Sequence, residues 1–326
     1  MEIKSLTGLR GLAALYVVAF HLTDRAAFPE INGFVQNGYI AVDFFFVLSG
    51  FIMSMVYHEK FKTIEQNNYI NYMYNRFSRI YPLYVTLLFS TLILDYLLNG
   101  RTQPNSSIFI NTFLLQSITA WNYIASSWSL STELIAYLLF PFIIFFMRDN
   151  RCILIFLMAA LATLAILFIS KSPNTLDHSF MYPSIARCIA DYILGIGAYI
   201  AHRNGIYIKR TISYICFAFL SWFLTTSESD LFTVILFVLI VPSLVDSKNL
   251  ISTILSMKPL HYIGEISYSI YLIHSILINQ FKEQMQHFEN WRLMALALTI
   301  LLSMISFHLV ENPSRKWLKN KRYKMA

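Results

Sequence analysis

Long apolar runs recur from Leu6 to Val310 and constrain this chain more than any other feature. A helix needs about 20 mostly apolar residues to cross the hydrocarbon core of a bilayer. Charged residues make up 13% of the 326 residues, against roughly 25% in a soluble domain, so most of the surface must face lipid. Because no Pro/Gly/Ser-rich linker separates the runs, the sequence predicts one all-α polytopic membrane domain over residues 1–326, without a separate soluble domain.

Ten segments satisfy the length requirement, some of them narrowly. They cover residues 6–22, 38–57, 78–98, 127–147, 152–170, 184–202, 210–226, 231–246, 263–282 and 291–311. The stretch 106–121 is apolar but interrupted by polar residues, so we interpret it as interfacial or re-entrant rather than as an eleventh span. The first segment contains Arg10 and ends in His21 without a small-x-small cleavage site, which favours a retained span over a signal peptide.

The distribution of Lys and Arg predicts the orientation. Alternating loops hold 18 of the 25 cations in one set and 5 in the other, the smaller set being Arg25, Arg101, Lys171, Lys282 and Arg292. Because cytoplasmic loops carry the excess of positive charge, both termini are predicted to be cytoplasmic. The same asymmetry explains the net charge of +7 without a nucleic-acid partner, since the sequence has no soluble basic module with interleaved aromatic residues.

The three cysteines, Cys152, Cys188 and Cys216, fall inside or beside apolar segments. Their separations do not match the spacing of metal ligands. We therefore expect packing roles for them and no metal site.

Charged residues inside spans are functional candidates because placing a charge in a membrane is costly. Arg10 and His21 are eleven residues apart, which returns to within about 20° of the same helix face after a rise of roughly 16 Å. They can mark one wall of a path through about half of the core, with Arg10 on the inner side. An alternative is equally open, in which Arg10 snorkels to the surface and His21 is a satisfied interfacial histidine.

Two carboxylates lie in the outer parts of inward-running segments. Asp43 falls close to the depth of His21, where a carboxylate can orient the imidazole and raise its basicity; a structural pairing with a helix end or an arginine is the alternative. Glu133 lies about one and a half turns below the outer surface, with Ser129 one turn earlier. The sequence thus predicts that His21, Asp43 and Glu133 gather as acid/base groups in the outer half.

Arg76 and Arg79 open the third segment, one helical turn apart on the same face. Two guanidiniums so placed can each fork onto phosphate oxygens, although the positive-inside bias explains them equally well. With Arg10 they give the inner half a set of phosphate-competent cations. This division suits a protein that binds a phosphorylated cytoplasmic donor and performs proton-transfer chemistry toward the outside.

The remaining intramembrane polar groups allow structural interpretations. Arg187 and Asp191, spaced i and i+4, are predicted to form an internal ion pair. His274 either lines the path or donates to a backbone carbonyl. Glu311 is expected to pair with an inner arginine as an anchor, and Pro313 is expected to end the last span.

These motifs resemble acyltransferase family 3, the membrane acyltransferases that include bacterial O-antigen, exopolysaccharide and capsule O-acetyltransferases. The resemblance covers essentially the whole chain in six ordered blocks: the Arg-x10-His pair of Arg10 and His21, "VDFFFVLSGF" around Asp43 and Ser49, "RFSRIYP" with Arg76 and Arg79, "WSLSTE" ending at Glu133, "GEISYSIYLIH" ending at His274, and "ENPSR" from Glu311 to Arg315. Path-lining or structural roles are expected for Ser49, Ser129, His274, Arg187, Asp191, Glu311 and Arg315.

The resemblance implies an acyl donor, usually acetyl-CoA, that is presented from the cytoplasm, and a glycan or lipid-linked glycan acceptor on the other side of a bacterial cytoplasmic membrane. It implies no permanently bound cofactor, His21 as the essential acid/base residue, and contacts between the arginines and the donor. Some members bear an extracytoplasmic esterase-like domain, which we do not expect because the sequence stops shortly after Arg315. The block "GYIAVD" before Asp43 also departs from the commoner Gly-Val-Asp.

A membrane transporter or flippase is the main rival interpretation, because the same intramembrane charges can form a substrate or proton path. The spacing of the predicted spans shows no inverted repeat, which disfavours this class. The sequence does not indicate an oligomeric state.

Overall fold

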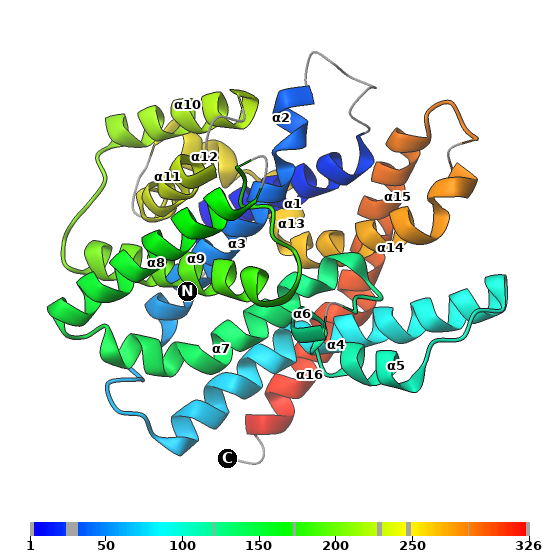
Figure 1. Ribbon diagram of the computed structural model, residues 1–326, viewed down its shortest axis with the longest axis horizontal. Helices are drawn as coiled ribbons and strands as arrows, with labels where there is room; N and C mark the ends of the chain where they lie inside the picture. Colours follow the sequence, from blue (N-terminus) through cyan, green and yellow to red (C-terminus); the bar gives the residue numbers. More distant parts are fainter. Residues whose placement is uncertain are drawn as a thin grey trace.

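The computed structural model describes residues 3–23, 32–119, 121–171, 174–226, 230–245, 249–285 and 287–323, in which the regular elements are all helices joined by loops (Figure 1). The first half contains α1 (Lys4–Leu22), α2 (Asn32–Gln36), the 3-10 turn η1 (Gly38–Ile40), α3 (Ala41–Tyr57), α4 (Gln66–Asn99), α5 (Asn105–Thr112), α6 (Gln116–Thr119), the 3-10 turn η2 (Ala125–Ser127) and α7 (Trp128–Phe146). The second half contains α8 (Asn150–Ser170), α9 (Met181–Arg203), α10 (Arg210–Thr226), α11 (Asp230–Ser243), α12 (Leu250–Leu255), α13 (Lys258–Glu265), α14 (Ser267–Met285), α15 (Trp291–Ser306), the π-helix η3 (Phe307–Glu311) and α16 (Asn312–Tyr323).

Seven helical segments in the described part of the chain are long and apolar enough to cross a membrane. They are Lys4–Leu22, Gly33–Tyr57, Gln66–Asn99, Ala125–Phe146, Asn150–Ser170, Met181–Arg203 and Trp291–Lys321. The prediction of an all-helical, polytopic membrane protein is therefore confirmed. Large apolar side chains on the outside of the bundle, such as Ile155 and Leu309, are placed to face lipid tails.

The count of ten spans and the orientation remain predictions. The predicted segments 210–226, 231–246 and 263–282 correspond to α10, to the short apolar α11 and to α14, whose last turns carry polar residues. Asp246, at the end of the second of these segments, lies outside the described residues, as do the cations Arg25, Lys248 and Lys324 that entered the count of charges.

Helices α3 and α9 pack with their backbones in contact at the centre of the protein. A Cβ atom at Gly50 would lie 2.1 Å from the carbonyl oxygen of Tyr192, and a Cβ atom at Gly195 would lie 2.1 Å from that of Val47. Glycine removes the atoms that would otherwise hold the two helices apart. This close approach allows a short side chain on α3 to reach a partner on α9.

Helix α1 approaches α12 and α13 in the same way. Gly8 faces the carbonyl oxygen of Leu255, and Gly11 faces the backbone of Gly264. The first helix is therefore fixed against the segment that leads into α14. This contact sets the position of the polar residues that α1 carries.

The third span begins earlier in the structure than the sequence predicts. The third span was predicted to begin at residue 78, but α4 begins at Gln66, because the preceding turns continue the helix and bury Tyr72. Arg76 and Arg79 consequently lie inside this helix rather than at its start.

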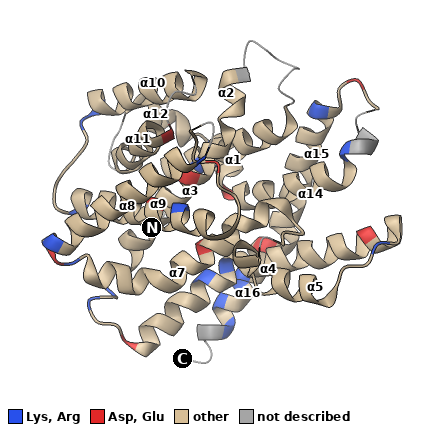
Figure 2. Ribbon diagram, in the orientation of Figure 1, with Lys and Arg blue, Asp and Glu red and all other residues tan. Residues whose placement is uncertain are grey.

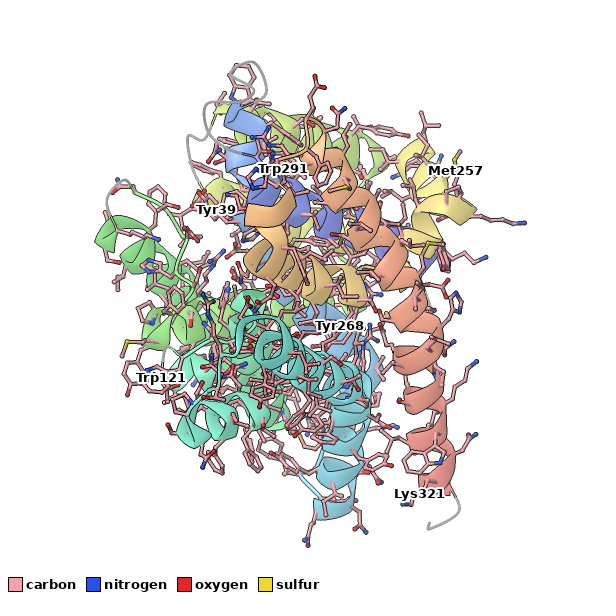
Figure 3. The ribbon with its side chains drawn as sticks, turned by 90° about the vertical axis from the view of Figure 1, so that its right-hand side faces the viewer. Tyr39, Trp121, Met257, Tyr268, Trp291 and Lys321 are labelled. Carbon is pink, nitrogen blue, oxygen red and sulfur yellow. The ribbon has the colours of Figure 1, made fainter. Side chains whose placement is uncertain are left out.

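The prediction that Pro313 ends the last span is wrong. The chain continues through it, because the π-helix η3 changes the hydrogen-bond register immediately before Asn312 and Pro313. Proline is tolerated in the first turn of a helix, where its missing N–H is not needed. The long element from Trp291 to Lys321 is visible along one side of the molecule (Figure 3).

The segment 106–121 forms the short helices α5 and α6, neither of which is long enough to span. Four of its polar side chains, those of Ser107, Asn111, Gln116 and Ser117, are buried in the protein. Gln116 donates to the Tyr84 hydroxyl over 3.1 Å, and Ser117 and Ser131 are joined by a hydrogen bond of 2.6 Å. These contacts explain how an interrupted polar segment is kept among apolar helices.

We expect Gly264→Ala to destabilise the protein. The new Cβ would lie 1.9 Å from the carbonyl oxygen of Thr7, so α1 and α13 must separate, at a cost of about 1–3 kcal/mol in the free energy of unfolding. Thermal unfolding in detergent should show a lower midpoint. Ala162→Val, which enlarges an exposed side chain on α8, is the matched control, and an equal loss in both variants would contradict the role of the backbone contact.

Candidate active site

A pocket of about 190 Å³ lies where α1 ends, between η1, α7, α9 and α14. It is lined by Val17, Phe20, His21, Tyr39, Val42, Ala125, Ser126, Trp128, Asp177, Ser179, Phe180, Arg187 and Tyr271. We call it the His21 pocket. It combines one imidazole, several aromatic rings and four further polar side chains, those of Ser126, Asp177, Ser179 and Arg187.

The hydrogen bonds of His21 determine which ring nitrogen is available for chemistry. Nδ1 lies 2.9 Å from the carbonyl oxygen of Val17. A carbonyl only accepts hydrogen bonds, so Nδ1 must carry the proton, and in the neutral ring Nε2 holds the lone pair. His21 is therefore oriented by its own helix as a potential base.

A second imidazole lies beside the first. His274 is fully buried, its Nδ1 donates to the carbonyl oxygen of Ile270 over 3.1 Å, and its ring centroid is 5.1 Å from that of His21. Of the two interpretations open from the sequence, the bond to a backbone carbonyl is thus present. Nε2 of His274 has no hydrogen-bond partner among the described residues.

Arg10 and His21 share the face of α1 that their spacing indicates. Arg10 donates from Nε to the Ser267 hydroxyl over 2.9 Å and from Nη2 to the carbonyl oxygen of Gly264 over 2.6 Å. His21 packs beside His274 further along α14. Both residues of the first block therefore contact α14 or the turn that leads into it.

Asp43 is held by Arg187 and not by His21. Arg187 Nε donates to Oδ1 over 2.7 Å and Nη2 contacts Oδ2, and both side chains are fully buried. The predicted ion pair between Arg187 and Asp191 is therefore wrong. The contact at Gly50 and Gly195 brings Asp43 to Arg187 from the neighbouring helix, while Asp191 interacts with this pair through its charge.

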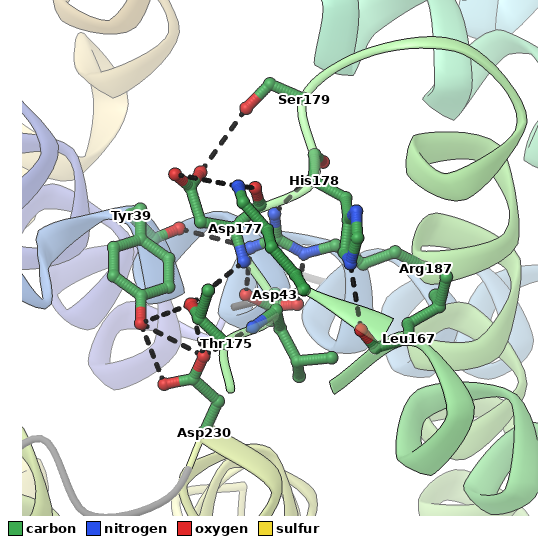
Figure 4. A network of polar contacts seen from close by, with 11 residues as sticks. Tyr39, Asp43, Leu167, Thr175, Asp177, His178, Ser179, Arg187 and Asp230 are labelled. Carbon is green, nitrogen blue, oxygen red and sulfur yellow. Dashed lines mark hydrogen bonds and ion pairs between the residues drawn. The ribbon is translucent and has the colours of Figure 1, made fainter. Parts of the chain in front are cut away.

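The segment from Thr175 to Ser179, which connects α8 to α9, is fixed by buried polar groups (Figure 4). Asp230 accepts hydrogen bonds from the Leu176 N–H over 2.6 Å and from the Thr175 hydroxyl over 3.0 Å. The His178 carbonyl accepts from Arg187 Nη1 over 3.2 Å, and the His178 ring contacts the carbonyl of Leu167. The sequence prediction missed Asp177, Ser179 and Asp230, although the polar run "TLDHS" shortly before the predicted span 184–202 was a usable signal for the first two.

Glu133 does not line the His21 pocket, which corrects its predicted grouping with His21. Its carboxylate accepts from the Ser49 hydroxyl over 2.6 Å and from the Tyr137 hydroxyl over 2.5 Å. The guanidinium of Arg76 lies 5.9 Å from the ring centroid of Tyr137. Glu133 belongs to the surroundings of the arginines, because a partly buried carboxylate is stabilised by nearby donors and cations.

Arg76 lies among tyrosines. Its guanidinium carbon is also 5.7 Å from the ring centroid of Tyr57, and Tyr72 and Tyr192 lie nearby. Nε of Arg76 is buried without a hydrogen-bond partner among the described residues. A planar guanidinium with an open donor suits an anionic ligand with forked oxygens.

Glu311 lies close to the remaining arginines of the sequence blocks. It accepts from the Ser269 hydroxyl over 2.7 Å and interacts electrostatically with Arg79, Arg10 and Arg315. Figure 2 shows Lys and Arg residues gathered where α4 and α16 lie together. Glu311 thus limits the repulsion within the cationic cluster.

Ser129 links the two groups of residues. Its hydroxyl shares a 2.7 Å hydrogen bond with the Tyr271 hydroxyl, and Tyr271 lines the His21 pocket. Successive turns of α7 therefore carry, in order, Ser129 beside the pocket, then Glu133 and Tyr137 beside Arg76. Across the described residues, no group of three His, Cys, Asp or Glu side chains has a geometry that could hold a metal ion.

Comparison with known proteins identifies the family of this chain. Residues 3–309 match the family model described as an acyltransferase domain, that of acyltransferase family 3. The chain belongs to this family. No solved structure matches it.

Curated relatives of this family member include the peptidoglycan O-acetyltransferase OatA of Listeria monocytogenes, 26% identical over 96% of this chain and 56% of the relative. O-acetyltransferase OatA of Staphylococcus aureus is 26% identical over 96% of this chain and 57% of its own length. Acyltransferase MdmB of Streptomyces mycarofaciens is 29% identical over 43% of this chain and 39% of the relative. The chain spans little more than half the length of the OatA relatives that it matches.

The sequence blocks of this acyltransferase family 3 member meet in space in three places. Arg10 contacts Ser267, Ser49 contacts Glu133, and Ser269 contacts Glu311. Each contact joins two blocks that are far apart in the chain. These contacts show that the blocks are joined through tertiary packing instead of forming separate local structures.

We expect Arg187→Met to lower the free energy of unfolding by about 3–5 kcal/mol, because it leaves the Asp43 carboxylate buried without its partner. The double variant Arg187→Met/Asp43→Asn should recover part of this loss, since the stranded charge is gone. Thermal unfolding of the four proteins in one detergent forms a double-mutant cycle. Additive losses would show that the two charges do not stabilise one another.

Proposed function

We propose that this protein is an O-acyltransferase that moves an acetyl group from cytoplasmic acetyl-CoA to a hydroxyl of an extracytoplasmic glycan. The observation that carries the proposal is the available Nε2 of His21 in a pocket lined by polar and aromatic side chains. Membership of the acyltransferase family supports the reaction type. The O-acetyltransferase names of the relatives, one of them for peptidoglycan, support a cell-envelope glycan as acceptor.

The chemistry proposed for His21 is general-base catalysis. Nε2 takes the proton of the acceptor hydroxyl while the hydroxyl oxygen attacks the thioester carbonyl. The new C–O bond forms as the C–S bond breaks, and the proton passes from the imidazolium to the leaving thiolate. Because Nδ1 is tied to the Val17 carbonyl, the ring keeps its tautomer and its orientation through the cycle.

The donor is proposed to bind through the arginines. Arg10 and Arg79 lie around Glu311, and Arg76 has an open Nε within its ring of tyrosines. Guanidiniums bind phosphate oxygens in a forked geometry, which matches the phosphates of coenzyme A. Glu133 acts here as a positioning residue. It accepts a hydrogen bond from the Tyr137 hydroxyl, and Arg76 lies over the ring of the same tyrosine.

The topology that this function requires has ten spans in one membrane domain with both termini in the cytoplasm. In that arrangement α1 runs outward from Lys4 to Leu22. Arg10 then lies nearer the cytoplasm and His21 nearer the outside, so donor and acceptor approach from opposite leaflets. The proposed path between them passes Tyr271 and Ser129, which are joined by a hydrogen bond.

His21→Gln should lower acyl transfer by about 10²–10⁴-fold, the usual contribution of a general base. The assay measures coenzyme A thiol released from acetyl-CoA by protein in detergent micelles, with peptidoglycan fragments as acceptor. His287→Gln, at an exposed residue after α14, is the matched control. A transporter or flippase needs a sealed membrane, so activity in micelles also separates the two classes, and undiminished release by His21→Gln would refute the assignment of the base.

Arg76→Gln should raise the KM for acetyl-CoA by about 10- to 100-fold, the value of a charge-assisted hydrogen bond. The KM for the glycan should change little, because Arg76 does not line the His21 pocket. Arg151→Gln removes an exposed cation at the start of α8 and controls for the loss of positive charge. A selective change in the KM for the glycan would contradict donor binding at Arg76.

A further inference from the structure

The segment from Thr175 to Ser179 is held more firmly than a connection between two helices requires. Four of its polar contacts reach separate elements: Asp230 on α11, Arg187 on α9, Leu167 on α8 and, through the Thr175 hydroxyl, Tyr39 in η1. Loops are usually the mobile parts of a structure, and a loop fixed by buried groups commonly carries function. We call residues 174–180 the Asp177 loop.

The Asp177 loop places two polar side chains in the His21 pocket. Asp177 and Ser179 both line it, and the charge of Asp177 is close enough to His21 to interact with the imidazole. The loop also contributes Phe180, and Trp128 lies in the same lining. Asp43, the other carboxylate of this region, is occupied by Arg187, so Asp177 is the carboxylate that the pocket presents.

The chemistry of this lining selects a hydroxyl-rich, uncharged ligand. An ionised carboxylate accepts several hydrogen bonds and donates none, so Asp177 favours ligands with neighbouring O–H groups and disfavours anions. Aromatic rings offer apolar faces, which match the C–H faces of a sugar ring. The Arg187 charge is already neutralised by Asp43 and does not draw an anion into the pocket.

The size of the pocket limits how much of such a ligand can enter. Its volume of about 190 Å³ is below the roughly 300–1,000 Å³ of pockets that enclose drug-sized ligands. A single sugar ring can enter, and the rest of a glycan must stay outside. The ring that enters brings its hydroxyl to His21.

We propose that the Asp177 loop is the acceptor-recognition element, in which the Asp177 carboxylate accepts hydrogen bonds from sugar hydroxyls next to the one that His21 deprotonates. The Ser179 hydroxyl, which donates to Asp177 Oδ1 over 3.4 Å, accepts a second hydrogen bond from the same ring, and Trp128 and Phe180 pack against its faces. This inference rests on the proposed function. It assigns acceptor specificity to a segment that lies outside the six sequence blocks.

The alternative role for Asp177 is structural. Its Oδ2 is 3.4 Å from Lys171 Nζ, and both side chains are partly exposed, at 41% and 38%. An exposed ion pair of this kind contributes little to stability. Lys171→Gln removes the pair but keeps the carboxylate, so it separates the two roles.

The experiment expresses each variant in a host strain that lacks its own copy of the gene, at matched membrane levels. Mass spectrometry measures the O-acetyl content of the surface glycans, and coenzyme A binding to the purified protein is measured in detergent. Asp177→Asn should reduce the O-acetyl content by about tenfold or more and leave the Kd for coenzyme A within twofold of the original. Lys171→Gln and Glu289→Gln, the latter at an exposed acidic residue between α14 and α15, should retain both properties.

Any other outcome contradicts either acceptor recognition by Asp177 or the proposed function itself. Unchanged O-acetylation in Asp177→Asn, or an equal loss in Lys171→Gln, overturns acceptor recognition by the carboxylate. A parallel loss of coenzyme A binding in Asp177→Asn shows that its effect is not confined to the acceptor, and also overturns it. Absence of O-acetylation by the unmodified protein instead overturns the proposed function and, with it, this inference.

Discussion

The buried ion pair between Asp43 and Arg187 is the interaction on which the rest of the structure depends. Two charges inside a membrane protein are tolerated when they pair with good geometry and their remaining donors are satisfied. Arg187 meets this condition, since it binds Asp43 at two atoms and also contacts the carbonyls of His178 and Tyr39. The pair thereby joins α3, α9, η1 and the Asp177 loop at one point beside the His21 pocket.

The sequence was sufficient for the features that depend on composition and helical period. Apolar runs predict the spanning helices, and the spacing of Arg10 and His21 predicts that they share a face. Both inferences concern a single helix. In a helix the rise per residue gives the length of a span, and the rotation per residue gives the face on which a side chain lies. The seven long apolar segments and the contacts of both residues with α14 or its leading turn agree with them.

Features that depend on neighbouring helices could not be predicted in this way. Asp191 is the nearest acid to Arg187 along the chain, yet Asp43 takes the arginine because Gly50 and Gly195 allow two backbones to touch. Glu133 has a depth compatible with His21, but its helix turns it toward Ser49 and Tyr137. The depth of a side chain in the membrane can be predicted from the sequence, whereas the neighbour that it faces depends on how the helices pack against one another.

The π-helix at Phe307–Glu311 has a consequence for the end of the chain. One added residue in a helical turn rotates everything after it by about 100° about the helix axis. That rotation sets the direction of α16, whose Leu318 carbonyl accepts a hydrogen bond of 2.9 Å from Tyr74 on α4. Deleting a single residue from this widened turn would swing the basic side chains of α16 away from α4 and toward the surrounding lipid.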